Sequence, residues 1–351
     1  MSVFNGDNIK VDIYGESHAE KIGVKCKGFP KFTFNVDKLK EFTDRRKPSK
    51  SSFSTPRKEA DEAIFISGVN NGEIENGEFE AVIYNTNKKS SDYNELYARP
   101  RPSHADYCAF VKDGRLDFSG GGRFSGRLTA PLCIAGGIAK QYLESKNVRI
   151  YAYLSSVGTV NGKSYKDGVL EEELLKIDGF PSINKKEEML TEIEKVSSEG
   201  DSVGAVIECV VYGFIKGVGD NLFSGLEGKL SYSLFGIPAV KGVEFGSGFD
   251  LAKSIGSKAN DSLYFDESGE VKTKTNHSGG ICGGISNGMP ITLRVGVKPT
   301  PSIFIEQDTV DLIRKENVKI KIKGRHDSCV SVRAVPVVES AVALALLDSI
   351  L

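Results

Sequence analysis

A glycine-rich segment at positions 120–130 restricts the fold of this chain more than any other part of the sequence. It reads Gly-Gly-Gly-Arg-Phe-Ser-Gly-Arg-Leu-Thr-Ala. Glycine has no Cβ and adopts positive φ readily, so the main-chain N–H groups of such a turn can approach a ligand closely. If a helix begins here, Arg123 and Arg127 lie on one face near its positive end, beside the hydroxyls of Ser125 and Thr129. The arrangement favours binding of an anion, most simply a phosphate, although an ordinary turn with solvated arginines would fit the same residues.

The composition indicates a soluble globular protein. The chain has 351 residues, 39% of them hydrophobic, and its 38 glycines favour tight turns over a helical bundle. Lys+Arg 46 against Asp+Glu 47 leave a net charge of −1, which argues against a general nucleic-acid or membrane-surface role. The sequence has no run of about 18 apolar residues and no signal-peptide pattern, so a cytoplasmic location is predicted. Because no linker or repeat divides the chain, one domain over residues 1–351 is predicted.

The spacing of the cysteines and histidines favours acid–base chemistry over metal binding. The six cysteines are scattered without a Cys-x-x-Cys pair, so neither a zinc site nor a disulfide framework is predicted. Every histidine lies in a turn rich in Gly, Ser, Pro or Asn, and no two of them have i, i+4 spacing. We therefore predict no metal site and favour a shared site for acid–base chemistry on an anionic substrate. The histidines are His18, His104, His277 and His326.

Hydrophobic periodicity predicts a mixture of strands and helices. The predicted strands are at 10–14, 63–66, 81–84, 148–160, 203–214 and 318–322, and the predicted helices at 131–145, 187–196 and 338–351. The strand at 203–214 is expected to be buried on both faces. The last helix is apolar on nearly every face, so it is expected in the core or between subunits.

Residues 38–58 form a basic segment that we predict to be a mobile loop. It has eight basic side chains and only two acidic ones. Pro48, Pro56 and five serines and threonines indicate a loop in its second half. In a neutral protein this local excess of charge is either a solvated face or a clamp for a polyanion, over which the loop could close.

Three further motifs place candidate catalytic groups where strands or turns end. Gly-Glu-Ser-His at 15–18 follows the first predicted strand and places a hydroxyl beside an imidazole. Arg-Pro-Arg-Pro-Ser-His-Ala-Asp at 99–106 contains two prolines, which fix an irregular backbone and hold its polar side chains in a small space. Gly-Arg-His-Asp at 324–327 follows the last predicted strand, in which apolar residues alternate with lysines.

Together these motifs resemble those of the chorismate synthase family. The matching blocks follow the family order and span nearly the whole chain, at 15–19, 44–49, 101–106, 120–127, 239–249, 276–280, 298–302, 324–329 and 333–336. The resemblance implies a lyase that converts 5-enolpyruvylshikimate 3-phosphate to chorismate, the last common step of the shikimate pathway to aromatic amino acids. Phosphate and a ring proton are lost, and reduced FMN is required although no net redox change occurs.

The resemblance also implies the architecture and the partners. The family fold is α+β, a single large domain built as a β-α-β sandwich with internal pseudo-symmetry, and the family assembles as a homotetramer. An external flavin reductant is expected, with NADPH as one source of electrons. The substrate carries two carboxylates and one phosphate, which gives a neutral protein a reason to gather arginines from distant loops. Loss of phosphate from an unactivated ring carbon benefits from cationic stabilisation and a proton donor.

Specific roles follow from the resemblance. His18 would donate a proton to the departing phosphate, His104 would act beside the flavin, and Asp327 with Ser17 would relay a proton away from flavin N5. The residues implied to bind substrate are Arg46, Ser52, Arg101, Arg127 and Arg325, of which Arg46 and Ser52 also align with positions assigned to NADP. The residues implied to bind FMN are Arg123, Phe124, Ser125, Pro238, Ala239, Gly283, Lys298, Pro299, Thr300, Pro301, Ser302 and Arg325.

Some positions depart from the family pattern, and two other functions compete with this interpretation. The departures are Ala19, Ser49, Ser103, Leu128, Asn221, Ser224 and Pro238. A non-catalytic FMN- or phosphometabolite-binding protein would keep the glycines and arginines but would not need His18, His104 and Asp327 together. A phosphotransferase is disfavoured, because the sequence has no Gly-x-x-x-x-Gly-Lys-Ser/Thr loop and no evident carboxylate cluster for Mg²⁺.

Overall fold

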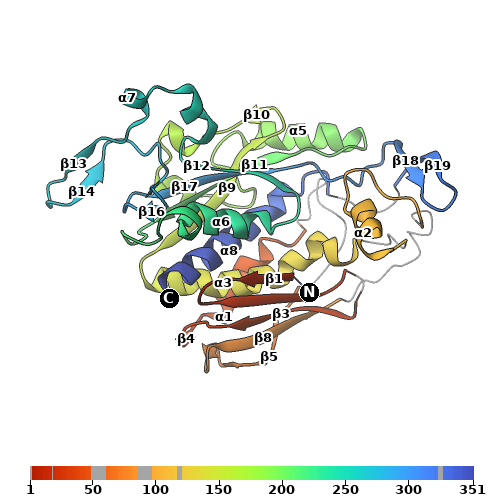
Figure 1. The fold of residues 1–351 in the computed structure, drawn as a ribbon, viewed down its shortest axis with the longest axis horizontal. Coiled ribbons are helices and arrows are strands. Elements are labelled where there is room, and N and C mark those ends of the chain that lie inside the picture. Colours follow the sequence, from red (N-terminus) through yellow and green to blue (C-terminus); the bar gives the residue numbers. More distant parts are fainter. Residues whose placement is uncertain (1, 18, 49–60, 86–96, 117–120, 323–326) are drawn as a thin grey trace.

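Two five-stranded antiparallel sheets enclose a layer of helices in the computed structural model (Figure 1). The structure describes residues 2–17, 19–48, 61–85, 97–116, 121–322 and 327–351. Residues 2–145 supply one sheet and the central helix α3 (Thr129–Ser145), and residues 149–350 supply the other sheet and the central helix α8 (Ser331–Ile350). This layering confirms the expected α+β fold and β-α-β sandwich.

The first sheet buries one face against the helices. Its strand order is β1 (Ser2–Asn5), β2 (Lys10–Gly15), β3 (Lys21–Lys27), β8 (Glu78–Tyr84) and β5 (Ile64–Ser67). In β3, the buried side chains of Ile22, Val24 and Cys26 alternate with exposed lysines. This period of two is what a strand with one face on the core requires. The last residue of β2, Gly15, begins the Gly-Glu-Ser-His motif.

The second sheet has a central strand that is buried on both faces. Its strand order is β10 (Val160–Asn161), β9 (Arg149–Val157), β11 (Ala205–Tyr212), β17 (Ile291–Val297) and β12 (Val240–Phe245). In β11, Ile207 and Cys209 belong to the main core, whereas Val210 packs with Tyr153 and Leu174 in a separate cluster on the outer face. The prediction of a doubly buried strand is therefore confirmed.

Smaller elements surround the sandwich. The other helices are α1 (Val36–Asp44), α2 (Asp106–Asp113), α4 (Glu171–Leu175), α5 (Lys186–Ser198), α6 (Leu226–Phe235) and α7 (Gly256–Ala259). The short strands form β4 (Phe32–Thr33) with β7 (Glu73–Ile74) and β6 (Val69–Asn70), β13 (Leu263–Phe265) with β14 (Val271–Thr273), β15 (Ile281–Cys282) with β16 (Ile285–Ser286), and β18 (Gln307–Asp311) with β19 (Glu316–Ile320). Within the described residues, no helix is both long and apolar enough to cross a lipid bilayer.

The central helices approach each other closely because α3 has glycines at the contact. A Cβ placed on Gly136 would lie 2.2 Å from Ser340 Cβ of α8, and one on Gly137 would lie 2.7 Å from Leu39 Cδ1 of α1. Such distances are far below van der Waals contact, so any side chain there would push the helices apart. The two glycines therefore set the spacing of the helical layer.

Two sequence predictions need correction. The last helix begins at Ser331, not at Val338, and it continues through Pro336. A proline here removes only the bond that its own N–H would give to Val332, and the buried packing of α8 compensates for that loss. The segment 38–58 is not a loop throughout, because α1 extends to Asp44 and Arg46 is buried. Residues 49–60 lie outside the described residues, so mobility of that part stays a prediction.

The helix spacing can be tested with two glycine-to-alanine variants. Gly136→Ala should lower the free energy of unfolding by about 1–3 kcal/mol, because the new methyl group overpacks the contact with Ser340. Gly228→Ala in α6 is the matched control, since the nearest atom to its new Cβ would be 3.9 Å away. The control should be neutral or more stable by about 0.5–1 kcal/mol, from the lower chain entropy of alanine. Urea denaturation measures both, and equal stability of the two variants would contradict the packing argument.

Candidate active site

The turn after β2 meets the glycine-rich segment. The Ser17 N–H donates a hydrogen bond to the carbonyl oxygen of Gly122 over 3.3 Å. The Ser17 hydroxyl oxygen is buried and has no hydrogen-bond partner among the described residues. A buried hydroxyl in that position is available to a ligand or a proton-transfer partner. The contact brings residues that are more than a hundred positions apart in the sequence into one place.

The glycine-rich segment folds as two short 3₁₀ turns, not as the start of one helix. The turns cover Gly122–Phe124 and Gly126–Leu128, and Ser125 between them is extended at φ −68° and ψ 137°. Arg123 and Arg127 therefore do not share a helical face. Arg123 is half-buried and pairs with Asp113 at the end of α2, whereas Arg127 is buried. The prediction of two guanidiniums side by side on one helix is wrong, because Ser125 interrupts the helical backbone.

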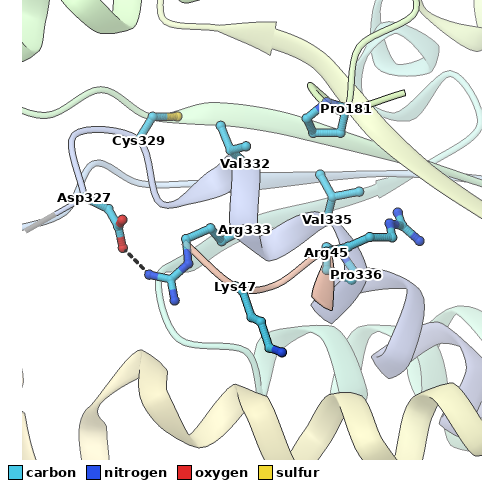
Figure 2. Close-up of a pocket in the computed structure, with 10 residues that line it drawn as sticks. Arg45, Lys47, Pro181, Asp327, Cys329, Val332, Arg333, Val335 and Pro336 are labelled. Atoms are coloured by element: carbon cyan, nitrogen blue, oxygen red, sulfur yellow. Dashed lines mark hydrogen bonds and ion pairs between the residues drawn. The ribbon is translucent and has the colours of Figure 1, made fainter. Parts of the chain in front are cut away.

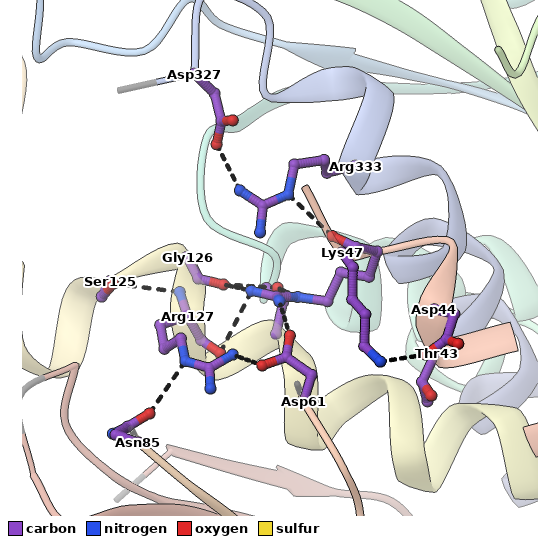
Figure 3. A network of polar contacts seen from close by, with 12 residues as sticks. Thr43, Asp44, Lys47, Asp61, Asn85, Ser125, Gly126, Arg127, Asp327 and Arg333 are labelled. Carbon is purple, nitrogen blue, oxygen red and sulfur yellow. Dashed lines mark hydrogen bonds and ion pairs between the residues drawn. The ribbon is translucent and has the colours of Figure 1, made fainter. Parts of the chain in front are cut away.

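Arg127 instead faces Arg46 across a buried carboxylate, that of Asp61 (Figure 3). Asp61 Oδ2 accepts from Arg46 Nη1 over 3.0 Å, and Asp61 Oδ1 accepts from Arg127 Nη1. Arg46 also donates from Nε to Thr129 Oγ1 and from Nη2 to the carbonyl oxygen of Gly126. Burial, and then repulsion from other guanidiniums, lower the pKa of Arg46 to about 10. Arg46 is still cationic at neutral pH, so this cluster is charged and desolvated.

A second ion pair adjoins this cluster. Arg333 donates from Nε to the carbonyl oxygen of Arg46 over 2.9 Å and from Nη1 to Asp327 Oδ2 over 2.6 Å (Figure 3). Figure 2 shows both side chains at a cavity of about 100 Å³, together with Arg45 and Lys47. Asp327 is thus a carboxylate at a cavity lined by three cationic side chains. Its ion-pair partner Arg333 lies on α8.

The 99–106 turn builds a third cluster around Asp106. Arg101 donates to Asp106 from its main-chain nitrogen, from Nε over 2.7 Å and from Nη2 over 2.9 Å. His104 Nδ1 lies 2.5 Å from Asp106 Oδ1. Burial acts to raise the pKa of Asp106, but Arg101 and His104 outweigh burial and lower the pKa to about 2. Because an ionised carboxylate only accepts, we assign the ring proton to Nδ1, which leaves Nε2 for proton exchange.

The 298–302 loop joins the third cluster to the second sheet. Lys298 donates from its main-chain nitrogen to the carbonyl oxygen of Ala239 over 3.0 Å, and from Nζ to Ser103 Oγ over 2.7 Å. Burial, and then the charge of Lys241, lower the pKa of Lys298. Both lysines line a cavity of about 380 Å³. Thr300 Oγ1 is buried without a hydrogen-bond partner among the described residues. The loop therefore offers a cation and a hydroxyl to an anionic ligand.

Contacts along the chain connect these clusters. Ser302 Oγ accepts from Arg101 Nη1 over 3.5 Å, and Ser202 Oγ donates to the carbonyl oxygen of Thr300 over 2.7 Å. The next residue, Val203, donates its N–H to the carbonyl oxygen of Ser328, beside Asp327. On the other side, α2 is joined to the glycine-rich segment by the pair of Arg123 and Asp113. All three clusters therefore belong to one connected set of contacts.

Comparison with known proteins identifies the family of this chain. A family model described as chorismate synthase matches residues 9–351. The chain belongs to the chorismate synthase family. It is therefore a lyase of the shikimate pathway.

Relatives in the family match over almost their full length. A chorismate synthase from Thermococcus kodakarensis is 42% identical over 350 residues, which is 99% of this chain and 97% of the relative. One from Dehalococcoides mccartyi is 39% identical over 351 residues, with 99% and 96% covered. A crystal structure of chorismate synthase superimposes with a TM-score of 0.74 at 23% identity, covering 98% of this chain and 92% of that one. That likeness shows the fold.

The structure brings together most of the described residues expected from the family. These are Ser17, Arg46, Arg101, His104, Arg123, Ser125, Arg127, Ala239, Lys298, Thr300, Ser302 and Asp327, with Phe124, Pro238, Pro299 and Pro301 adjacent to them in the chain. His18, Ser52, Arg325 and His326 lie outside the described residues.

Two expected residues lie apart. Gly283 is exposed in the β15–β16 turn, and the neighbouring Gly284 packs against Asp220 and Gly225. His277 contacts Ser247 Oγ through Nδ1 over 3.2 Å. No contact within the described ranges joins either residue to the three clusters, so the prediction that all four histidines share a site is not supported for His277.

Two residues of the site were missed by sequence reasoning. Asp61 and Arg333 carry a carboxylate and a guanidinium into the first two clusters. Arg333 lies in a matching block at 333–336, which was a usable signal. Asp61 follows the basic segment 38–58, and an acidic residue beside such an excess of positive charge was the only hint of its role.

The Asp106 cluster can be tested by pH. Because the folded-state pKa is about 2, against the ordinary aspartate value of 3.8, the ionised group stabilises the fold above about pH 4, and this stabilisation is lost as pH falls toward 2. The shift corresponds to about 2 kcal/mol. Asp106→Asn should lower the free energy of unfolding by about this amount at pH 7 and flatten its decrease between pH 4 and pH 2. Denaturation curves across this range measure it, and parallel pH profiles for both proteins would contradict the assignment.

Proposed function

We propose that the three clusters form the site at which this enzyme converts 5-enolpyruvylshikimate 3-phosphate to chorismate and phosphate. The observation that carries the proposal is the excess of buried positive charge. In the first two clusters, three guanidiniums (Arg46, Arg127 and Arg333) share two carboxylates (Asp61 and Asp327). Among the described residues these guanidiniums outnumber the carboxylates, and in a largely buried place a positive charge attracts an anion more strongly than it would in water. The substrate's phosphate and carboxylates supply that anion.

The residues around Lys298 fit reduced FMN, which we propose as the cofactor. In the 298–302 loop the buried hydroxyl of Thr300 has no hydrogen-bond partner among the described residues, and Lys298 has a lowered pKa beside a cavity of about 380 Å³. The Ser17 hydroxyl, in the turn after β2, is likewise buried without a partner among the described residues. Unpaired donors and a cation suit a phosphorylated, hydrogen-bonding group. When bound, reduced FMN supplies an electron reversibly, with no net redox change. The residues proposed to hold it are Arg123, Phe124, Ser125, Pro238, Ala239, Arg325 and Lys298 to Ser302. The family resemblance adds Gly283, which within the described residues lies apart from the three clusters.

The chain's own groups are proposed to move the two protons. His18 would protonate the departing phosphate, a role that follows from the family motif at 15–18. His104 would act through Nε2, because Asp106 holds Nδ1. Asp327, held by Arg333, and Ser17 would accept and relay the ring proton. The guanidiniums of the first two clusters would stabilise charge on the leaving phosphate.

The wider context is proposed from the family. We propose a cytoplasmic homotetramer that receives reduced flavin from an external reductant, with NADPH as one source of electrons. The exposed apolar side chains of Phe223, Phe249, Leu263 and Phe265 support burial in an assembly. Arg46 aligns with a family NADP position, as Ser52 does. Its guanidinium is buried against Asp61, which favours a role toward the substrate over one toward a nicotinamide.

An anaerobic assay tests the proposal. Wild-type enzyme with chemically reduced FMN and 5-enolpyruvylshikimate 3-phosphate should release phosphate and chorismate in equal amounts, and oxidised FMN should give neither. His104→Ala should bind FMN normally but turn over about 10²–10⁴-fold more slowly, as expected for the loss of a positioned acid or base. Flavin binding without phosphate release by the wild type would instead support the non-catalytic FMN-binding protein. Normal turnover in His104→Ala would remove that residue from the mechanism.

A further inference from the structure

Asp61 has an unusual position in the first cluster. Its side chain is 3% exposed, and those of Arg46 and Arg127 are 6% and 5% exposed. Each carboxylate oxygen serves a different arginine, and the two arginines come from segments about eighty residues apart. Figure 3 shows the carboxylate pointing at Arg127. One side chain thus holds two guanidiniums at a fixed separation.

Without this carboxylate the two guanidiniums would repel each other. The charges of Arg333 and Arg127 both act to lower the pKa of Arg46, whereas that of Asp61 acts to raise it. Two buried cations without an anion between them would separate toward solvent, because an uncompensated buried charge costs several kcal/mol. Fixing both long side chains in advance also removes the entropy that an incoming ligand would otherwise have to overcome.

Asp61 differs from two other deeply buried carboxylates, Glu339 and Asp348, in what it contacts. Glu339 and Asp348 both accept main-chain N–H groups, from Ala152 and from Asp7, Asn8 and Ile9 respectively. They therefore stabilise backbone geometry. Among the described residues, Asp61 accepts hydrogen bonds from two arginine side chains of the proposed substrate site. Its contribution is accordingly to the placement of those side chains.

We propose that Asp61 is a positioning residue for substrate binding, which fixes Arg46 and Arg127 as a preorganised pair for the anionic groups of the substrate. The inference rests on the proposed function, because it names the residue that prepares that site. Asp61 does not touch the reacting atoms. It acts through the two arginines.

Asp61→Asn is the variant that tests this with least disturbance. Asp61 has φ +45°, in the left-handed region, which asparagine tolerates as well as aspartate does. The substitution keeps size and backbone but removes the charge. Loss of the charge-assisted bonds should raise KM for the substrate by about 10- to 100-fold, with a much smaller change in kcat. Asp348→Asn is the matched control, because Asp348 is equally buried but roughly 20 Å further along α8 than Arg333.

The outcomes separate the alternatives. A raised KM in Asp61→Asn, with an unchanged KM and a lowered melting temperature in Asp348→Asn, supports positioning. An unchanged KM in Asp61→Asn would reduce Asp61 to a structural role, and a lowered KM would mean that Asp61 competes with substrate for the arginines. Either result overturns the proposal. Failure of the wild type to release phosphate would count against the proposed function instead.

A double variant keeps the test decisive if Asp61→Asn folds poorly. Asp61→Asn combined with Arg127→Gln removes one of the two like charges along with the carboxylate. If Asp61 acts through the arginines, the KM of the double variant should rise by less than the product of the two single effects, because coupled residues are not additive. Independent, multiplying effects on KM would overturn the proposal.

Discussion

The buried carboxylate of Glu339 joins the central helices to the sheet and to the site. It lies on α8 and accepts from Arg45 after α1, from Lys140 of α3 and from the N–H of Ala152 in β9. Burial acts to raise the pKa of Glu339, but Lys140 and Arg45 outweigh burial and lower the pKa to about 2. Removing one partner of such a group typically costs about 3–5 kcal/mol. Arg45 directly precedes Arg46 in the chain. The ion pair of Arg45 with Glu339 therefore also fixes the backbone position from which the Arg46 guanidinium enters the site.

The site repeats this arrangement, in which a carboxylate holds cationic side chains from different segments. Arginines from distant segments are each held by a carboxylate, Asp61, Asp106 or Asp327, before any substrate is present. A cation held in this way binds an anion with little reorganisation, which is the main source of electrostatic catalysis. Among the described residues of the first two clusters the carboxylates are fewer than the guanidiniums, so this part of the site carries positive charge toward the proposed substrate. Stability and function therefore depend on the same ion pairs.

Short-range patterns in the sequence predicted the features that depend on strand periodicity or on close spacing along the chain. The alternation in β3, the doubly buried run in β11 and the closeness of His104 to Asp106 all follow from short-range periodicity or spacing. The pairing of Asp61 with two arginines does not, because nothing in the sequence around Asp61 specifies which distant side chains it meets. The start of α8 before Pro336 was missed because burial, not propensity, decides it. Family motifs predict candidate functional residues, Asp327 among them, but not that Asp61 holds two of their arginines.

The most direct test of the account is an experimental structure of the enzyme with FMN and 5-enolpyruvylshikimate 3-phosphate bound. The account predicts that phosphate or carboxylate oxygens of the substrate lie within hydrogen-bond distance of both Arg46 and Arg127 while Asp61 still bridges them. It also predicts flavin contacts with Lys298 and Thr300. Substrate density remote from these arginines, or a carboxylate of Asp61 displaced by the substrate, would contradict it.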